Sequence, residues 1–145
     1  MSAETHRWPA GAVVTGAGRG LGRQIAGLLV ERGYRVLVTD LDEAAAQQVA
    51  RELGEPATAL ALDVRDDAAV RAARDRIIAV AGRLDVWVNN AGVLFTGPAW
   101  EHDEQQRRLM IEVNAIGTMN GTLAAVESMR ADGGGQIINI ASLAG

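Results

Sequence analysis

A glycine-rich segment near the start of the chain restricts its fold more than any other feature of the sequence. Residues 15–22 read T-G-A-G-R-G-L-G, after an apolar run at 12–14 and before a helical pattern at 24–31. Such a turn between a strand and a helix lets the backbone approach a phosphate group and leaves N–H donors at the helix start. The segment predicts a phosphate-binding turn, although a turn without a ligand stays an open alternative. Its candidate binding residues are Gly16, Gly18, Arg19, Gly20, Leu21 and Gly22.

The glycine spacing separates this turn from two better-known phosphate loops. The pattern is G-x-x-x-G-x-G, and G-x-G-x-x-G fails because Leu21 stands where the third glycine is required. The loop G-x-x-x-x-G-K-S/T fails because the sequence contains no lysine.

Strand-like and helix-like patterns alternate along the chain. We expect strands at 12–15, 35–39, 59–62, 85–88 and 136–141, and helices at 21–32, 43–53, 67–80 and 101–130. Asp42 is a plausible N-cap of the second helix, and Asp66 or Asp67 of the third. Apolar strands between amphipathic helices predict an α/β fold, a Rossmann-type doubly wound parallel sheet of order 3-2-1-4-5. We expect one such domain at 11–145, after a polar N-terminal tail at 1–10.

Composition excludes several classes of function. The chain has no cysteine and two histidines, so thiolate chemistry is excluded and a metal site is not expected. A net charge of −4 argues against a nucleic-acid partner. No apolar run is long enough to span a membrane, and the polar N-terminus lacks the apolar stretch of a signal peptide, so we expect a cytoplasmic protein.

Polar residues follow the expected strands at the edge of the sheet where ligands bind in doubly wound folds. Asp40 follows the second strand, where a carboxylate can accept hydrogen bonds from an adenosine ribose and repel a 2′-phosphate, which favours NAD over NADP. Arg19 argues the other way, because a cation in the turn can pair with that phosphate. Asp63 and Val64 follow the third strand and can contact an adenine, although Asp63 is also a common turn residue.

Together these motifs resemble the classical short-chain dehydrogenase/reductase family. The matching segments are the glycine turn, Asp63, the sequence N-N-A-G at 89–92, Asn114 after Val113, and Q-I-I-N-I-A-S at 136–142. They occur in the family's order from about Ala12 onward, so the resemblance covers essentially the whole chain.

The resemblance implies an NAD(H)-dependent oxidoreductase that moves a hydride between the nicotinamide and a small-molecule secondary alcohol or ketone. It implies that Asn89, Ala91 and Gly92 line the cofactor pocket and that Asn89 braces its strand. It implies that Ser142 is the catalytic serine, and that the backbone carbonyl of Asn114 holds a relay water at a helix distortion. Without the family, Ser142 reads as a turn serine and Asn114 as a packing amide.

The chain departs from the family at its most important pair. Members carry a Tyr-x-x-x-Lys motif after the serine, whereas this sequence contains no lysine and a single tyrosine, Tyr34, at the start of the second strand. We therefore expect the chain to be the N-terminal portion of a longer enzyme, inactive as given, that lacks the family's C-terminal strands and helices. The strand Ile137–Ile140 and one flank of the helix at 101–130 would then be uncovered.

Other interpretations remain open. The chain could be a natural short form, a non-catalytic module that binds NAD or adenosine nucleotides, or a fragment without function. The full-length form is expected to be a dimer or tetramer. Leu94, Phe95 and Trp100 suggest an apolar substrate, but ordinary loop packing explains them equally well.

Overall fold

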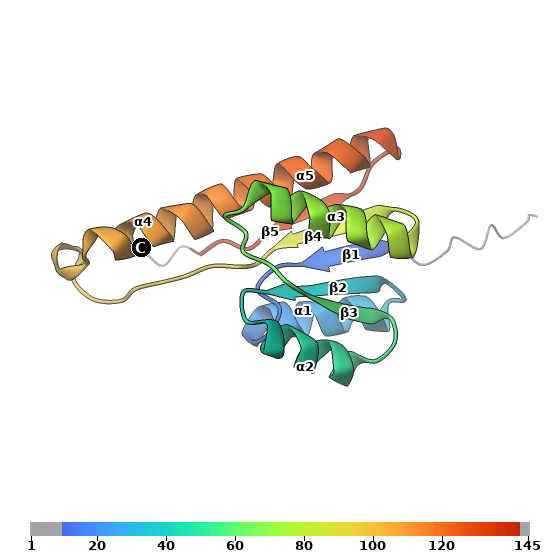
Figure 1. Cartoon of the computed structure of the whole chain (residues 1–145), viewed down its shortest axis with the longest axis horizontal. Coiled ribbons are helices and arrows are strands. Elements are labelled where there is room, and N and C mark those ends of the chain that lie inside the picture. The colour runs from blue at the N-terminus through green and yellow to red at the C-terminus, as the bar shows by residue number, and fades with distance from the viewer. Residues whose placement is uncertain (1–9, 143–145) are drawn as a thin grey trace, which may run out of the picture.

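The computed structural model describes residues 10–142 as a parallel sheet between two layers of helices (Figure 1). The five strands are ordered β3-β2-β1-β4-β5, which confirms the predicted topology. Their bounds are β1 Gly11–Val14, β2 Arg35–Asp40, β3 Ala57–Ala61, β4 Leu84–Asn89 and β5 Gln136–Asn139. The first three helices are α1 Gly20–Glu31, α2 Glu43–Leu53 and α3 Asp67–Ala81.

Local sequence signals position these helices. The side chains of Asp42 and Asp66 accept hydrogen bonds from Ala45 N and Ala69 N, both at 3.1 Å, and so cap α2 and α3 as expected. By contrast, α1 begins after Arg19 with no side-chain cap. The backbone N–H groups at the start of α1 therefore lack the side-chain acceptor that α2 and α3 have.

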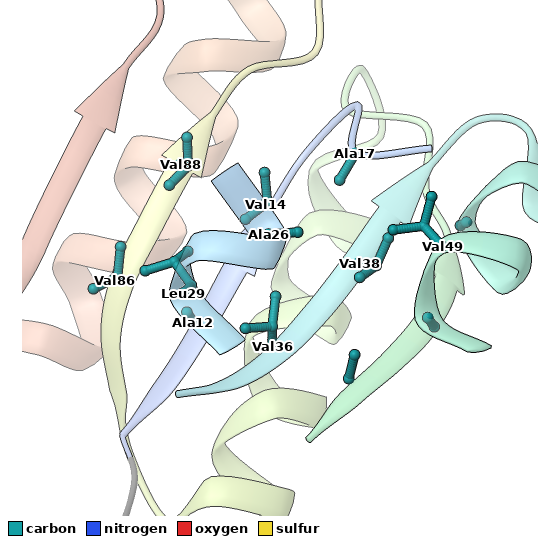
Figure 2. Packing of buried hydrophobic residues seen from close by; sticks show 13 residues of the cluster. Ala12, Val14, Ala17, Ala26, Leu29, Val36, Val38, Val49, Val86 and Val88 are labelled. Carbon is teal, nitrogen blue, oxygen red and sulfur yellow. The ribbon is translucent and has the colours of Figure 1, made fainter. Parts of the chain in front are cut away.

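Each face of the sheet carries its own apolar core, because successive strand residues point to opposite sides. Figure 2 shows one core, in which valines of β1, β2 and β4 face Ala26 and Leu29 of α1 and Val49 of α2. On the other face, Trp87 and Leu37 are fully buried among residues of α3 and α5. Two-sided burial explains why these strands read as continuous apolar runs.

The helix predicted at 101–130 is more complex than the sequence suggests. A 3-10 turn at Ala99–Glu101 precedes α4 (Glu104–Ile111), a π-helical segment at Glu112–Gly117, and α5 (Thr118–Ala131). The start at Glu101 was wrong because Asp103 caps α4, which begins at Glu104; the Asp103 carboxylate and the Gln106 side chain form a reciprocal capping box. The π segment places Asn114 at a distortion within an otherwise continuous helical run.

Apolar side chains remain exposed at one edge of the structure, as the sequence predicted. Ile138 and Ile140 of the β5 region are 36% and 40% exposed, whereas the valines of β4 are buried. Ile111, Met119 and Leu123 expose more than half of their surface along α4 and α5. Within residues 10–142, no helix is long and apolar enough to cross a bilayer. Residues 1–9 of the tail expected at 1–10 lie outside the described residues.

Candidate functional site

A cavity of about 460 Å³ opens at the carboxyl ends of the strands, between the turn after β1, the loop after β3 and the segment after β4. Nine of the twelve predicted cofactor residues line it: Gly16, Arg19, Gly20, Leu21, Asp40, Asp63, Val64, Ala91 and Gly92. Gly18, Gly22 and Asn89 lie behind this lining. In the described part of the chain, no group of three or more His, Asp or Glu side chains is placed to hold a metal ion.

The backbone of the glycine turn is left-handed at two positions. Gly16 and Gly20 have φ angles of +62° and +56°, a left-handed conformation that side chains disfavour. A Cβ at Gly16 would lie 2.7 Å from the Ala91 Cα atom, whereas a Cβ at Gly20 would meet nothing within 4 Å. Gly20 therefore faces open space at the uncapped start of α1, a favourable place for an anion.

Gly18 and Gly22 shape the turn from behind. Gly18 N donates to Asp40 Oδ2 at 2.9 Å, and a Cβ on Gly18 would lie 2.8 Å from the same oxygen. A Cβ on Gly22 would lie 2.4 Å from the Asn90 side-chain nitrogen. Both positions require a residue without a side chain.

Backbone donors fix the Asp40 carboxylate at the end of β2. Gly18 N donates to Oδ2 and Asp42 N donates to Oδ1, both at 2.9 Å. Arg19 instead pairs with Asp42 at 3.3 Å, and its side chain is 72% exposed. Asp40 thus presents a negative charge to the cavity without neutralisation by the nearby arginine.

Asp63 is held by its neighbour Arg65, which also lines the cavity. The Arg65 guanidinium donates to both Asp63 oxygens, with Nη2 at 2.7 Å from Oδ2. Hydrogen bonding from Arg65 holds the pKa of Asp63 below its ordinary value of 3.8, and the same pairing raises the pKa of Arg65. Arg65 Nη1 also reaches Glu112 Oε2 at 3.4 Å, so the network joins the loop after β3 to the π segment.

Val64 also connects the loop after β3 to the helical run that contains the π segment. Its side chain is buried, and a Cβ on Gly117 would come within 2.5 Å of Val64 Cγ2. Asn120 Nδ2 donates to the Val64 carbonyl at 2.9 Å. One wall of the cavity is therefore anchored to the helix that carries Asn114.

The two asparagines after β4 have different environments. Asn89 is 4% exposed, accepts from Trp87 Nε1 at 2.8 Å and donates to Asn139 Oδ1 at 2.8 Å and to Thr122 Oγ1 at 3.1 Å. It therefore braces β4, β5 and α5 from within, and Asn90 lines the cavity in its place. Asn90 Nδ2 donates to the Thr15 and Gly16 carbonyls, both at 3.0 Å, and so ties the glycine turn to β4.

Asn114 ties the π segment to the loop after β4. Its side chain accepts from Val93 N and donates to the Val93 carbonyl, both at 2.8 Å. The Asn114 carbonyl accepts a hydrogen bond from Thr118 Oγ1 at 2.8 Å. Ser142 lies exposed just beyond β5, at the same carboxyl edge of the sheet. Neither Asn114 nor Ser142 lines the cavity itself.

Comparison with known proteins adds the deciding observation. The family model described as short chain dehydrogenase matches residues 10–145. This chain belongs to the short-chain dehydrogenase/reductase family. Members of this oxidoreductase family use the nicotinamide dinucleotides NAD or NADP.

Curated relatives of this dehydrogenase family share more than a third of their aligned residues with the chain. A sorbitol dehydrogenase of Cereibacter sphaeroides is 37% identical over 135 residues, which cover 92% of this chain and 53% of the relative. A D-threitol dehydrogenase of Mycolicibacterium smegmatis is 39% identical over 136 residues, covering 92% of this chain and 52% of the relative. A 3-alpha-(or 20-beta)-hydroxysteroid dehydrogenase of Mycobacterium tuberculosis is 35% identical over 134 residues, covering 92% and 52%. The chain thus spans about half the length of these relatives.

Sequence reasoning missed three residues that shape the cavity. Thr15 Oγ1 is buried and accepts hydrogen bonds from Asn90 N and Ala91 N, both at 3.0 Å. Asn90 and Arg65 line the cavity. Thr15 and Asn90 stood within the matched motifs, whereas nothing about Arg65 in the sequence distinguishes it from the chain's other arginines.

Proposed function

We propose that this protein is an NAD(H)-dependent oxidoreductase, acting in its full-length form on a small-molecule secondary alcohol or ketone. The observation that carries the proposal is the Asp40 carboxylate, fixed by two backbone N–H groups beside an open glycine turn. A carboxylate in this place accepts from the ribose hydroxyls and repels a 2′-phosphate. NAD is therefore preferred over NADP.

The position of Arg19 supports this preference. A cation at this position would favour NADP if it were available to the 2′-phosphate. Arg19 is paired with Asp42 rather than with Asp40, so the carboxylate keeps its charge toward the cavity. The glycine turn would bind the pyrophosphate, and Asp63 and Val64 would contact the adenine. Ala91 and Gly92 would line the cofactor pocket beside the turn.

The chain's own residues would hold the substrate and a water. A bound nicotinamide would supply the hydride acceptor or donor. The Ser142 hydroxyl would hydrogen-bond the substrate oxygen. The Asn114 carbonyl, which accepts a hydrogen bond from Thr118 Oγ1, would hold a relay water.

A chain without lysine cannot by itself supply the family's Tyr-x-x-x-Lys pair. Loss of a general acid/base costs about 10²–10⁴-fold in rate. We therefore expect this chain to bind the dinucleotide and to turn over negligibly. An assay with NAD and simple secondary alcohols tests this, and robust turnover would contradict it.

Calorimetry tests the cofactor assignment directly. NAD and ADP-ribose should bind the chain, and NADP should bind at least about tenfold more weakly than NAD. Asp40→Ala should reduce this difference, whereas Asp75→Ala, which removes a surface carboxylate of α3 outside the cavity, should leave it unchanged. A wild-type preference for NADP would refute the role of Asp40, and no heat from any of the three nucleotides would refute the proposal.

A homo-oligomeric, cytoplasmic full-length protein is a further part of the proposal. The exposed apolar residues of α4, α5 and β5 favour association, either with a second copy or with the rest of a longer chain. Light scattering on the full-length protein tests the oligomeric state, and a monomer at micromolar concentration would contradict it.

A further inference from the structure

Both carboxylate oxygens of Asp63 accept hydrogen bonds from a single residue. Asp63 Oδ1 accepts from Arg65 N and Arg65 Nε, both at 3.0 Å. Asp63 Oδ2 accepts from Arg65 Nη2 at 2.7 Å and shares the Nε–H at 3.2 Å. Three N–H groups of Arg65 thus engage a carboxylate that offers about four lone-pair sites. A nucleotide base that donates a hydrogen bond to Asp63 must therefore compete with the Arg65 guanidinium for the carboxylate oxygens.

Arg65 is also restrained from the other side. Its Nη1 points to Glu112 at 3.4 Å, at the start of the π segment. The contacts with Asp63 and Glu112 use one N–H on each of the three guanidinium nitrogens, out of the five N–H groups that a guanidinium carries. Since both Asp63 and Arg65 line the cavity, the pair offers the cavity hydrogen-bond donors as well as a carboxylate whose two oxygens already accept from Arg65.

We propose that the base subsite of this nucleotide site accepts a 6-oxopurine dinucleotide about as well as NAD. Adenine presents an amino donor at its sixth position, and hypoxanthine presents a carbonyl acceptor there. An unpaired carboxylate would select the amino group and repel the carbonyl. A carboxylate whose two oxygens already accept from Arg65 loses most of that selectivity, and the guanidinium can donate to the carbonyl instead. The inference rests on the proposed dinucleotide function.

Titration calorimetry with NAD and with nicotinamide hypoxanthine dinucleotide tests the proposal. The two dissociation constants for the wild-type chain should agree within about threefold, well under the roughly tenfold or larger effect of one hydrogen bond to a charged group. Arg65→Ala and Arg65→Gln free the Asp63 oxygens, so both variants should prefer NAD by about tenfold or more. Arg108→Ala is the matched control, because Arg108 pairs with Glu104 on exposed α4 outside this cavity, and its ratio should stay as in the wild type.

The possible outcomes separate this inference from the function on which it rests. A wild-type preference of tenfold or more for NAD overturns the inference and leaves the dinucleotide site intact. An unchanged ratio in both Arg65 variants, with native circular dichroism, overturns the role of Arg65. No binding of either dinucleotide to the wild type overturns the proposed function and the inference together.

Discussion

Gly121 of α5 lies directly against Asn89 of β4, and a Cβ at position 121 would come within 2.1 Å of the Asn89 side-chain oxygen. The same Cβ would lie 2.5 Å from Trp87 Nε1, the donor that holds this oxygen. The helix approaches the sheet this closely only because position 121 has no side chain. The buried network of Asn89 depends on that approach.

Gly121→Ala should therefore destabilise the fold by about 1–3 kcal/mol, the usual cost of overpacking a core. Gly27→Ala is the matched control, since its Cβ would lie at an ordinary 3.6 Å from Leu53 in the middle of α1. That substitution should stabilise the helix by about 0.5–1 kcal/mol. Urea denaturation of the two variants measures both, and equal effects would contradict the packing argument.

Thr15→Val should cost at least about 2 kcal/mol, because it leaves the N–H groups of Asn90 and Ala91 without their buried acceptor. Thr15→Ser keeps the hydroxyl and removes one methyl group, with an expected cost of about 1 kcal/mol. Chemical denaturation distinguishes the two. A valine variant as stable as the serine variant would show that Thr15 acts by packing alone.

Gly20→Ala should distinguish an effect on NAD binding from an effect on stability. A left-handed alanine costs about 1–2 kcal/mol, and its methyl group would project into the open space of the cavity. Gly33→Ala imposes the same kind of strain, at φ +85° and with nothing within 4 Å, at the far end of α1. Both variants should lose similar stability in thermal melts, but only Gly20→Ala should weaken NAD binding, by about tenfold or more. Equal NAD affinities would place the phosphates elsewhere.

The Asp63–Arg65 pair should contribute to stability in a pH-dependent way. Because Arg65 lowers the folded-state pKa of Asp63 below 3.8, this contribution is complete above that pH and is lost as pH falls through the lowered value. The stability difference between the wild type and Arg65→Ala should be constant from neutral pH down to about pH 5 and should shrink below 3.8. Urea titrations at several pH values measure this difference. A stability difference that grows as the pH falls would contradict the lowered pKa assigned to Asp63.

Most of the fold could be predicted from short-range sequence patterns. Asp42 and Asp66 cap their helices through contacts three residues along the chain, so their role can be inferred from the sequence alone. The glycine turn and Asp40 were likewise accessible, because their spacing reflects backbone geometry within one strand-turn-helix unit.

Features that depend on tertiary register could not be inferred in this way. Asn89 and Asn90 are consecutive, so their side chains point to opposite sides. The side chain of Asn89 bonds to Asn139 and Thr122, and Asn139 reaches it only because β5 pairs with β4. The side chain of Asn90 points to the glycine turn instead. The Arg65 fork is one rotamer among several that the sequence permits. The π segment has no local sign either, since Asn114 pairs with Val93, which lies in another part of the chain.

The π segment also decides where the helical run tolerates a change in chain length, which single substitutions do not reveal. Each residue of an α-helix advances its azimuth by about 100°. Deleting one residue between Glu112 and Gly117 would let the segment relax to a regular α-helix. Because the wide π turn already absorbs one extra residue, this deletion would leave α4 and α5 facing nearly as they do, whereas deleting one residue within α5 would turn α4 by about 100° and move Glu112 away from Arg65. The π segment is thus a place in this helical rod where a residue can be removed without turning the two halves apart.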